Sequence, residues 1–263
     1  MKLIPLFLLV GMFAIAGWAE DAKPEAYSPE LVKDAEAQYK LGRSYYNGKG
    51  VTKNYKEAVK WITKSAELGY AEGQGGLGIL YYKGEGVTRD YKEAVKWFTK
   101  AAEQGNAIAE RNLGICYYNG HGLAQDYNEA VKWYTKAAEQ GDSQGQNGLS
   151  NCYYKGQGVT QDYKEAVKWY TKAAEQGDGD AQLNLGLLYH KGEGVAKDYK
   201  EAYKWITKSA EQGNAYGQYN LGLCYYEAVG IAKDKEEAVK WITKAAEQGD
   251  EDAKEWLKIL KSK

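Results

Sequence analysis

Tryptophan recurs along this chain at a fixed interval of 36 residues. The six copies are Trp61, Trp97, Trp133, Trp169, Trp205 and Trp241. The letters around them recur as well, so that residues 81–105 and residues 153–177 are nearly identical. A period of this length is typical of stacked repeat proteins, in which each unit contacts only its neighbours. We therefore predict a solenoid rather than one compact core. A repeat position is named below after its residue in the first copy.

The hydrophobic spacing within one copy predicts two helices. In residues 107–119, Leu113, Cys116 and Tyr117 are spaced to share one helical face. A glycine then ends this helix, and Asp126 is placed to cap a second one. Each copy is thus predicted to be a helical hairpin, and the fold class is predicted to be all-α.

The order of segments can be predicted from the same pattern. Residues 28–250 are predicted to hold six hairpins, and residues 251–263 a polar helix that caps the last one. Residues 20–27 are interpreted as a linker. Residues 1–19 combine a single lysine with an uncharged, mostly apolar run that ends in small residues, which is the pattern of a secretory signal peptide. Because such a run is near the lower length limit of a membrane span, an uncleaved anchor is the alternative.

Charge and cysteine content restrict the expected partners and chemistry. The 35 basic and 36 acidic residues nearly cancel, so nothing predicts nucleic acid as a partner, and a membrane is expected only through the N-terminal segment. Cys116, Cys152 and Cys224 share one repeat position. Equivalent positions in stacked helical units lie roughly 10 Å apart, too far for a disulfide. We expect buried free thiols.

The glycine pairs and the histidines do not predict a cofactor or a metal site. The G-x-G pair recurs in nearly every copy after a predicted helix rather than after a strand, so it is interpreted as a turn and not as a phosphate-binding loop. His121 and His190 lie far apart in sequence, with no second histidine at helical spacing. The acidic residues recur as helix caps.

The recurring pattern A-x-x-x-L-G-x-x-Y-x-x-G-x-G-V-x-x-D-Y-x-E-A-x-x-W-x-x-K-A-A-E-x-G resembles the Sel-1-like repeat family, a relative of the tetratricopeptide repeats. The resemblance covers residues 35–250. It implies a right-handed superhelix of paired helices and an adaptor role, often in the bacterial envelope or among secreted factors. The fourth copy departs at Ser150, and the sixth copy lacks the first loop glycine.

The function expected from this resemblance is that of an exported, periplasmic or secreted scaffold without enzymatic activity. One alternative comes from a cysteine-rich branch of the family, which is associated with weak β-lactam binding or hydrolysis. This chain lacks the paired cysteines of that branch and the S-x-x-K, S-D-N and K-T-G motifs. A second alternative is a purely structural spacer.

The predicted partner is a protein or an extended peptide that binds the concave face. By analogy with tetratricopeptide repeats, that face is expected on the first helix of each hairpin, at the 36, 39, 43, 46 and 47 positions. The Tyr46 position is aromatic in every copy, whereas the Tyr39 and Arg43 positions vary. An equal alternative is that the Tyr46 position packs between adjacent first helices. The predicted binding residues are Tyr39, Arg43, Tyr46, Tyr82, Arg111, Tyr118, Asn147, Asn151, Tyr154, Leu183, His190, Tyr219 and Tyr226.

Overall fold

The protein is all-helical over residues 34–261, the part of the chain that its structure, a computed structural model, describes. Within this range there are thirteen helices and no strand. They are α1 (Ala35–Asn47), α2 (Tyr55–Glu67), α3 (Ala71–Lys83), α4 (Tyr91–Glu103), α5 (Ala107–Asn119), α6 (Tyr127–Glu139), α7 (Ser143–Lys155), α8 (Tyr163–Glu175), α9 (Gly179–Lys191), α10 (Tyr199–Glu211), α11 (Ala215–Glu227), α12 (Lys235–Glu247) and α13 (Glu251–Lys261).

The predicted fold class, six hairpins followed by a C-terminal helix, is confirmed. The predicted signal peptide (1–19), the linker (20–27) and the start of the first repeat (28–33) lie outside the described residues. None of the helices between residues 34 and 261 combines the length and the apolar character that a membrane crossing requires.

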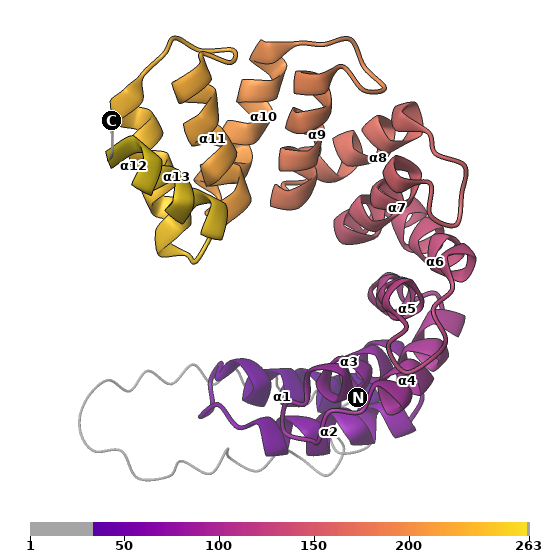
Figure 1. Cartoon of the computed structure of the whole chain (residues 1–263). Helices are drawn as coiled ribbons and strands as arrows, with labels where there is room; N and C mark the ends of the chain where they lie inside the picture. The colour runs from indigo at the N-terminus through magenta and orange to yellow at the C-terminus, as the bar shows by residue number, and fades with distance from the viewer. Residues whose placement is uncertain (1–33, 262–263) are drawn as a thin grey trace, which may run out of the picture.

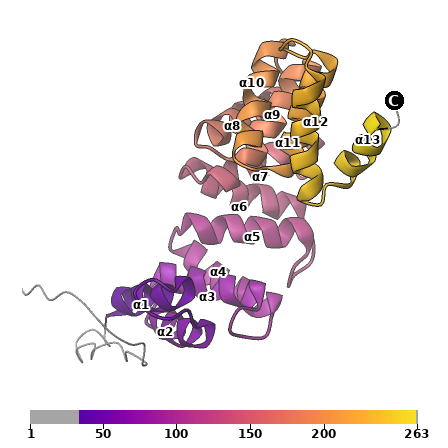
Figure 2. The same ribbon diagram turned by 90° about the vertical axis from the view of Figure 1, so that its left-hand side faces the viewer.

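The helices stack into an arc (Figure 1). Consecutive helices pack against each other from α1 to α13, and first helices of adjacent repeats also touch, as α1 does with α3 and α5 with α7. In the middle of the arc, α5 and α7 lie on the inner side, with α6 and α8 outside them. The turned view shows the repeats as one continuous stack that ends at α13 (Figure 2). The first helix of each hairpin therefore lines the concave side.

The two helices of a hairpin approach each other closely at a small residue. A Cβ atom on Gly114 would lie 2.5 Å from Cδ1 of Tyr134 on the facing helix. Because non-bonded carbon atoms prefer separations of about 3.5–4 Å, this position favours glycine. In the fourth copy Ser150 takes the place, and its hydroxyl donates to the carbonyl of Gln146 within the helix at 2.8 Å.

Both glycines of the G-x-G pair serve the turn, as the sequence predicted. Gly84 ends α3 in the left-handed conformation at φ 75°, and its N–H donates to the carbonyl of Leu80 at 2.8 Å. A Cβ atom on Gly86 would clash with the carbonyl group of Tyr55 in the preceding repeat. In the sixth copy Ala228 adopts the left-handed conformation at φ 62°, so the turn persists without the first glycine.

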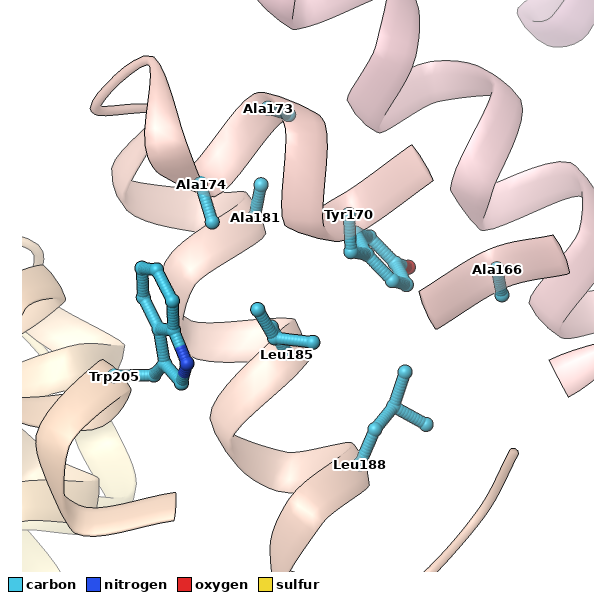
Figure 3. Packing of buried hydrophobic residues seen from close by; sticks show 8 residues of the cluster. All are labelled: Ala166, Tyr170, Ala173, Ala174, Ala181, Leu185, Leu188 and Trp205. Atoms are coloured by element: carbon cyan, nitrogen blue, oxygen red, sulfur yellow. The ribbon is translucent and has the colours of Figure 1, made fainter. Parts of the chain in front are cut away.

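Each junction between repeats has its own apolar cluster instead of sharing one core. Figure 3 shows one of them, in which Tyr170 from α8, Leu185 and Leu188 from α9 and Trp205 from α10 pack among small alanine side chains. Clusters of this kind recur from the first repeats to α13. The stability of each repeat therefore depends on its neighbours.

The three cysteines lie in these clusters as buried free thiols, which confirms the sequence prediction. Cys116, Cys152 and Cys224 are each at most 4 % exposed. Burial raises the pKa of all three thiols to about 12. The thiolate, which is the reactive form of cysteine, is therefore disfavoured in the folded protein.

A chain of buried hydrogen bonds runs beside the apolar clusters. In the second repeat Gln74 accepts from Nε2 of Gln104 at 2.7 Å, and its own Nε2 donates to the carbonyl of Ala66 in the preceding repeat at 3.3 Å. The same arrangement recurs for the pairs Gln146–Gln176, Gln182–Gln212 and Gln218–Gln248. The third repeat differs because Glu110 stands at this position and accepts from Gln140 at 2.6 Å.

Candidate partner-binding face

One stripe of each first helix faces the concave side. On α5 this stripe consists of Ile108, Asn112, Ile115 and Asn119, which are spaced at i, i+4, i+7 and i+11. Ile108 is 46 % exposed, whereas Leu113 between them is buried. The stripe thus contains the 36, 43 and 47 positions that the sequence analysis selected. It also contains the 40 position, which was not among the predicted positions although the same helical spacing indicates it.

The Tyr39 position lies at the joint with the next repeat. The ring of Tyr39 contacts that of Tyr70, the residue before α3, with centroids 5.8 Å apart. In the third repeat Arg111 forms an ion pair with Asp142, the residue that caps α7, and Nη1 and Oδ2 are 3.0 Å apart. Leu183 is only 7 % exposed. These residues hold adjacent repeats together.

The remaining predicted residues of this position, Asn147 and Tyr219, are also half-buried. Tyr219 packs beside the cluster that joins α12 and α13. A direct role in partner binding for this position stays a prediction.

The Tyr46 position reaches across to the turn of the next repeat. The hydroxyl of Tyr46 donates to Glu85 at 2.7 Å and that of Tyr118 to Gln157 at 2.5 Å. The Tyr82 hydroxyl pairs with Nδ1 of His121 at 2.9 Å. Each of these partners is the middle residue of a G-x-G turn. Burial raises the pKa of Tyr46 and Tyr82, which keeps their hydroxyls protonated.

Lysines from the next repeat complete this contact on the concave side. Lys83 donates to the hydroxyl of Tyr46 at 3.3 Å, and Lys155 and Lys191 make the equivalent bonds to Tyr118 and Tyr154 at 3.1 and 3.2 Å. At the C-terminal end His190 lies against Tyr199, and Tyr226 against Trp256 of α13. The Tyr46 position therefore joins adjacent repeats, while its half-exposed rings remain next to the concave stripe.

A hollow of about 320 Å³, called here the first hollow, opens on the concave side between α1 and α3. Its apolar lining comes from Ile62, Ile79, Leu80 and Ile108, and its rim carries charged and polar side chains. Tyr39, Arg43, Tyr46, Asn47, Gly76 and Lys83 complete the lining. The predicted residues Tyr39, Arg43 and Tyr46 thus meet in one place.

A second hollow of about 190 Å³ lies three repeats further along, between α7 and α9. Its lining includes Tyr154, Lys155, Leu187 and Lys191, together with the predicted residue Asn151. The amide of Asn151 accepts a hydrogen bond of 2.8 Å from Tyr170 at the floor. The two hollows therefore use the same repeat positions with different side chains.

Titratable groups are spread over the repeats in the described part of the chain. Between residues 34 and 261 no group of three or more His, Cys, Asp or Glu side chains could hold a metal ion. His121 lies stacked on Tyr91, with centroids 4.6 Å apart, and is held by Tyr82. The concave side offers contact surface and hydrogen-bonding groups for a partner.

Comparison with known proteins identifies relatives of these repeats. The sequence profile described as Sel1 repeat matches residues 35–70, 71–106, 107–142, 143–178, 179–214 and 215–250. Two solved structures superpose on most of the chain. One is c5321, a protective antigen present in uropathogenic Escherichia coli strains and displaying an SLR fold, with 39 % identity, a TM-score of 0.75 and coverage of 87 % of this chain and 50 % of that one.

The other structure is a Sel1 repeat protein from Oxalobacter formigenes, with 39 % identity and a TM-score of 0.77, covering 83 % of this chain and 87 % of that one. Among curated proteins, the putative sel1-like repeat-containing protein L18 of Acanthamoeba polyphaga mimivirus is 56 % identical over 34 residues, which are 13 % of this chain and 6 % of that protein. The chain thus spans half the length of c5321 and a small part of the viral protein.

Proposed function

The chain belongs to the Sel1 repeat family, and we propose that it is an exported, non-enzymatic scaffold that binds another protein or an extended peptide on its concave side. The observation that carries this proposal is the pair of hollows between successive first helices, which use the same positions with different linings. Pockets with apolar walls and a few placed polar groups are the usual form of a binding site.

The contrast between the two sides of the arc supports the same function. On the second helices, a lysine lies over the tryptophan of every copy, with Nζ 3.9 to 4.4 Å from the ring centroid. This outer contact is the same in all six repeats. The Arg43 position on the inner side changes instead, through Ile79, Ile115, Asn151, Leu187 and Leu223. A contact that stays constant on the second helices beside a position that varies on the first helices favours selection of one partner, whereas a spacer would need no variation.

Export is supported by residues 1–19, whose pattern is that of a signal peptide. The proposed destination is the periplasm or the extracellular medium of a bacterium. N-terminal sequencing of the exported protein is expected to begin at residue 17 or at residue 20. An intact Met1 in the membrane fraction would instead establish the uncleaved anchor.

Binding can be tested by capture from the native envelope fraction, with the purified chain as bait. A concave variant with Ile108→Glu and Tyr216→Glu places charge on two side chains that are 46 % and 64 % exposed, so folding should be retained. The matched control is Val239→Glu on the second helix α12, whose side chain is also exposed.

We expect the original chain and the Val239→Glu variant to capture a protein that the concave variant does not capture. Equal capture by all three baits would contradict a concave binding site. A nitrocefin assay on the same preparation is expected to show no turnover, and clear turnover would contradict the non-enzymatic assignment.

A further inference from the structure

The first hollow combines an apolar floor with two cations at its rim. Ile62 and Leu80 are almost fully buried beneath it, and Ile108 from α5 adds an exposed apolar wall. Arg43 and Lys83 are both exposed and line the same hollow. An apolar group that enters here would bury carbon surface and come close to two positive charges.

These two cations have no carboxylate partner within 4 Å among residues 34–261, whereas ten other ion pairs occur there. Arg43 instead lies over the ring of Tyr39 at 5.7 Å, and Lys83 donates to the hydroxyl of Tyr46. The nearby carboxylate of Glu85 accepts from that same hydroxyl. The rim therefore has positive charge available for an anionic group.

The second hollow repeats this chemistry in a smaller volume, about 190 Å³ against about 320 Å³. Leu187 and Leu188 supply apolar surface, and Lys155 and Lys191 supply the cations. Lys191 has one weak ion pair, with Glu193 at 3.8 Å. Asn184 stands here where the first hollow has Gly76, and the absent side chain at Gly76 is one reason why the first hollow is larger.

The separation of the two hollows sets the length of a partner that would fill both. They are three repeats apart along the concave side. The first helices α1, α3, α5 and α7 contact one another in order, so each step is about 10 Å. Three steps are roughly 30 Å, which an extended chain covers in about nine residues.

We propose that the concave side binds an extended internal segment of a protein that carries two apolar–acidic residue pairs about nine residues apart, one pair for each hollow. The apolar side chain enters the hollow and the neighbouring side-chain carboxylate contacts the two rim cations. This inference rests on the proposed function and specifies the class of partner. An internal segment is favoured over a chain end because two hollows on one continuous surface must be filled by the same chain.

The probe is a fluorescein-labelled synthetic peptide with blocked ends on a glycine–serine background. It carries two phenylalanine–glutamate pairs about nine residues apart, and fluorescence anisotropy with the full purified chain measures its affinity. One comparison peptide has the pairs about four residues apart, and one has glutamine in place of glutamate. A third has a single phenylalanine at a free C-terminus. We expect the affinity of the widely spaced peptide to be at least roughly tenfold higher than that of the closely spaced one, because only the widely spaced peptide engages both hollows.

Variants of the protein assign the binding to the rim cations. Two double variants each remove the cations of one hollow, Arg43→Ala with Lys83→Ala and Lys155→Ala with Lys191→Ala. Each should lower the affinity for the probe on the order of tenfold, because charge-assisted hydrogen bonds are lost. Gly76→Asn introduces the residue found in the second hollow, and it should lower the affinity for the probe because its side chain fills the first hollow. The matched control is Lys60→Ala with Lys96→Ala on the outer helices, which should leave the affinity for the probe unchanged. All altered residues except Gly76 are exposed, and melting temperatures will verify that the variants fold.

Each outcome decides the inference. Loss of affinity with glutamine, with the short spacing and with either rim variant supports it. Equal binding at both spacings, tighter binding of the peptide with the free C-terminus, or unchanged affinity in the rim variants overturns it. If a native partner is captured by the concave side yet survives all four rim substitutions, this inference fails while the proposed function stands.

Discussion

The buried carboxylate of Glu110 accepts a hydrogen bond of 2.6 Å from the side-chain amide of Gln140, at a joint where the second, fourth, fifth and sixth repeats pair two glutamines. Glu110 is 4 % exposed. A glutamine here would also donate to the carbonyl of Ala102, as Gln74 does to Ala66. An ionised carboxylate has no proton for that bond.

Glu110→Gln is therefore expected to stabilise the protein by about 1 kcal/mol at neutral pH, the contribution of one added hydrogen bond and one removed buried charge. Burial raises the pKa of Glu110, while the amide of Gln140 and the charge of Lys136 act in the opposite direction. Urea unfolding of the two proteins at a pH of about 7.5 measures the difference in their free energies of unfolding.

The same substitution has a pH signature. Because the pKa of Glu110 is higher in the folded state than in the unfolded state, the folded protein binds this proton more tightly. Its contribution to stability is therefore greatest at low pH and is lost as the pH rises through the folded-state pKa. The advantage of the Gln variant should shrink as the pH is lowered. An advantage that stays constant with pH would show that the charge of Glu110 does not cause it.

Ala228→Gly is expected to stabilise the sixth repeat. Ala228 has φ 62°, and the left-handed conformation costs a residue with a Cβ atom about 1 kcal/mol relative to glycine. The gain should appear in urea unfolding. The matched control is Gly156→Ala, at φ 67° in the fourth repeat, which should lose a similar amount. No change in the free energy of unfolding in either variant would contradict a left-handed conformation at this turn position.

The fold could be predicted from the sequence because each structural requirement recurs in at least five of the six copies. The glycine opposite Tyr134, the paired turn glycines and the aspartate caps each recur at the 36-residue interval, so chance agreement is excluded. On the first helices the predicted positions included the 39 position but not the 40 position, and partner binding by any of them stays a prediction. Tyr39 and Arg111 have their partners, Tyr70 and Asp142, in the next repeat, and the periodicity of one helix does not show how the next repeat is placed.

Two features of the binding face depend on that placement and could not be predicted. The first hollow is lined by side chains from α1, α2, α3 and α5, and the sequence does not show that these helices meet there. The rim lysines could be seen in the sequence, but not their bonds to the tyrosine hydroxyls of the preceding repeat. Glu110 was visible as the one exception among six glutamine positions, and a comparison of the copies would have found it.

The thiols of Cys116, Cys152 and Cys224 are expected to react slowly in the native protein. They are buried, and burial raises the pKa of each to about 12, so the thiolate is scarce at neutral pH. Ellman titration should therefore show little reaction until urea unfolds the chain, and then three thiols. Rapid labelling of any one of them in native buffer would show that its repeat opens locally.

Substitution of Tyr118 should separate its role as a joint from its role in binding. Tyr118→Ala removes a half-buried ring that packs beside Tyr134, and we expect a loss of about 2 kcal/mol in stability together with weaker partner binding. Tyr118→Phe keeps the ring but removes the hydroxyl that bonds Gln157 and Lys155, so it should cost about 1 kcal/mol. If the exposed part of the ring contacts the partner, the Phe variant should bind almost as the original chain does. If both variants lose binding equally at a temperature where both are folded, the partner contacts the hydroxyl. If Tyr118→Ala leaves the melting temperature unchanged, Tyr118 does not join repeats three and four.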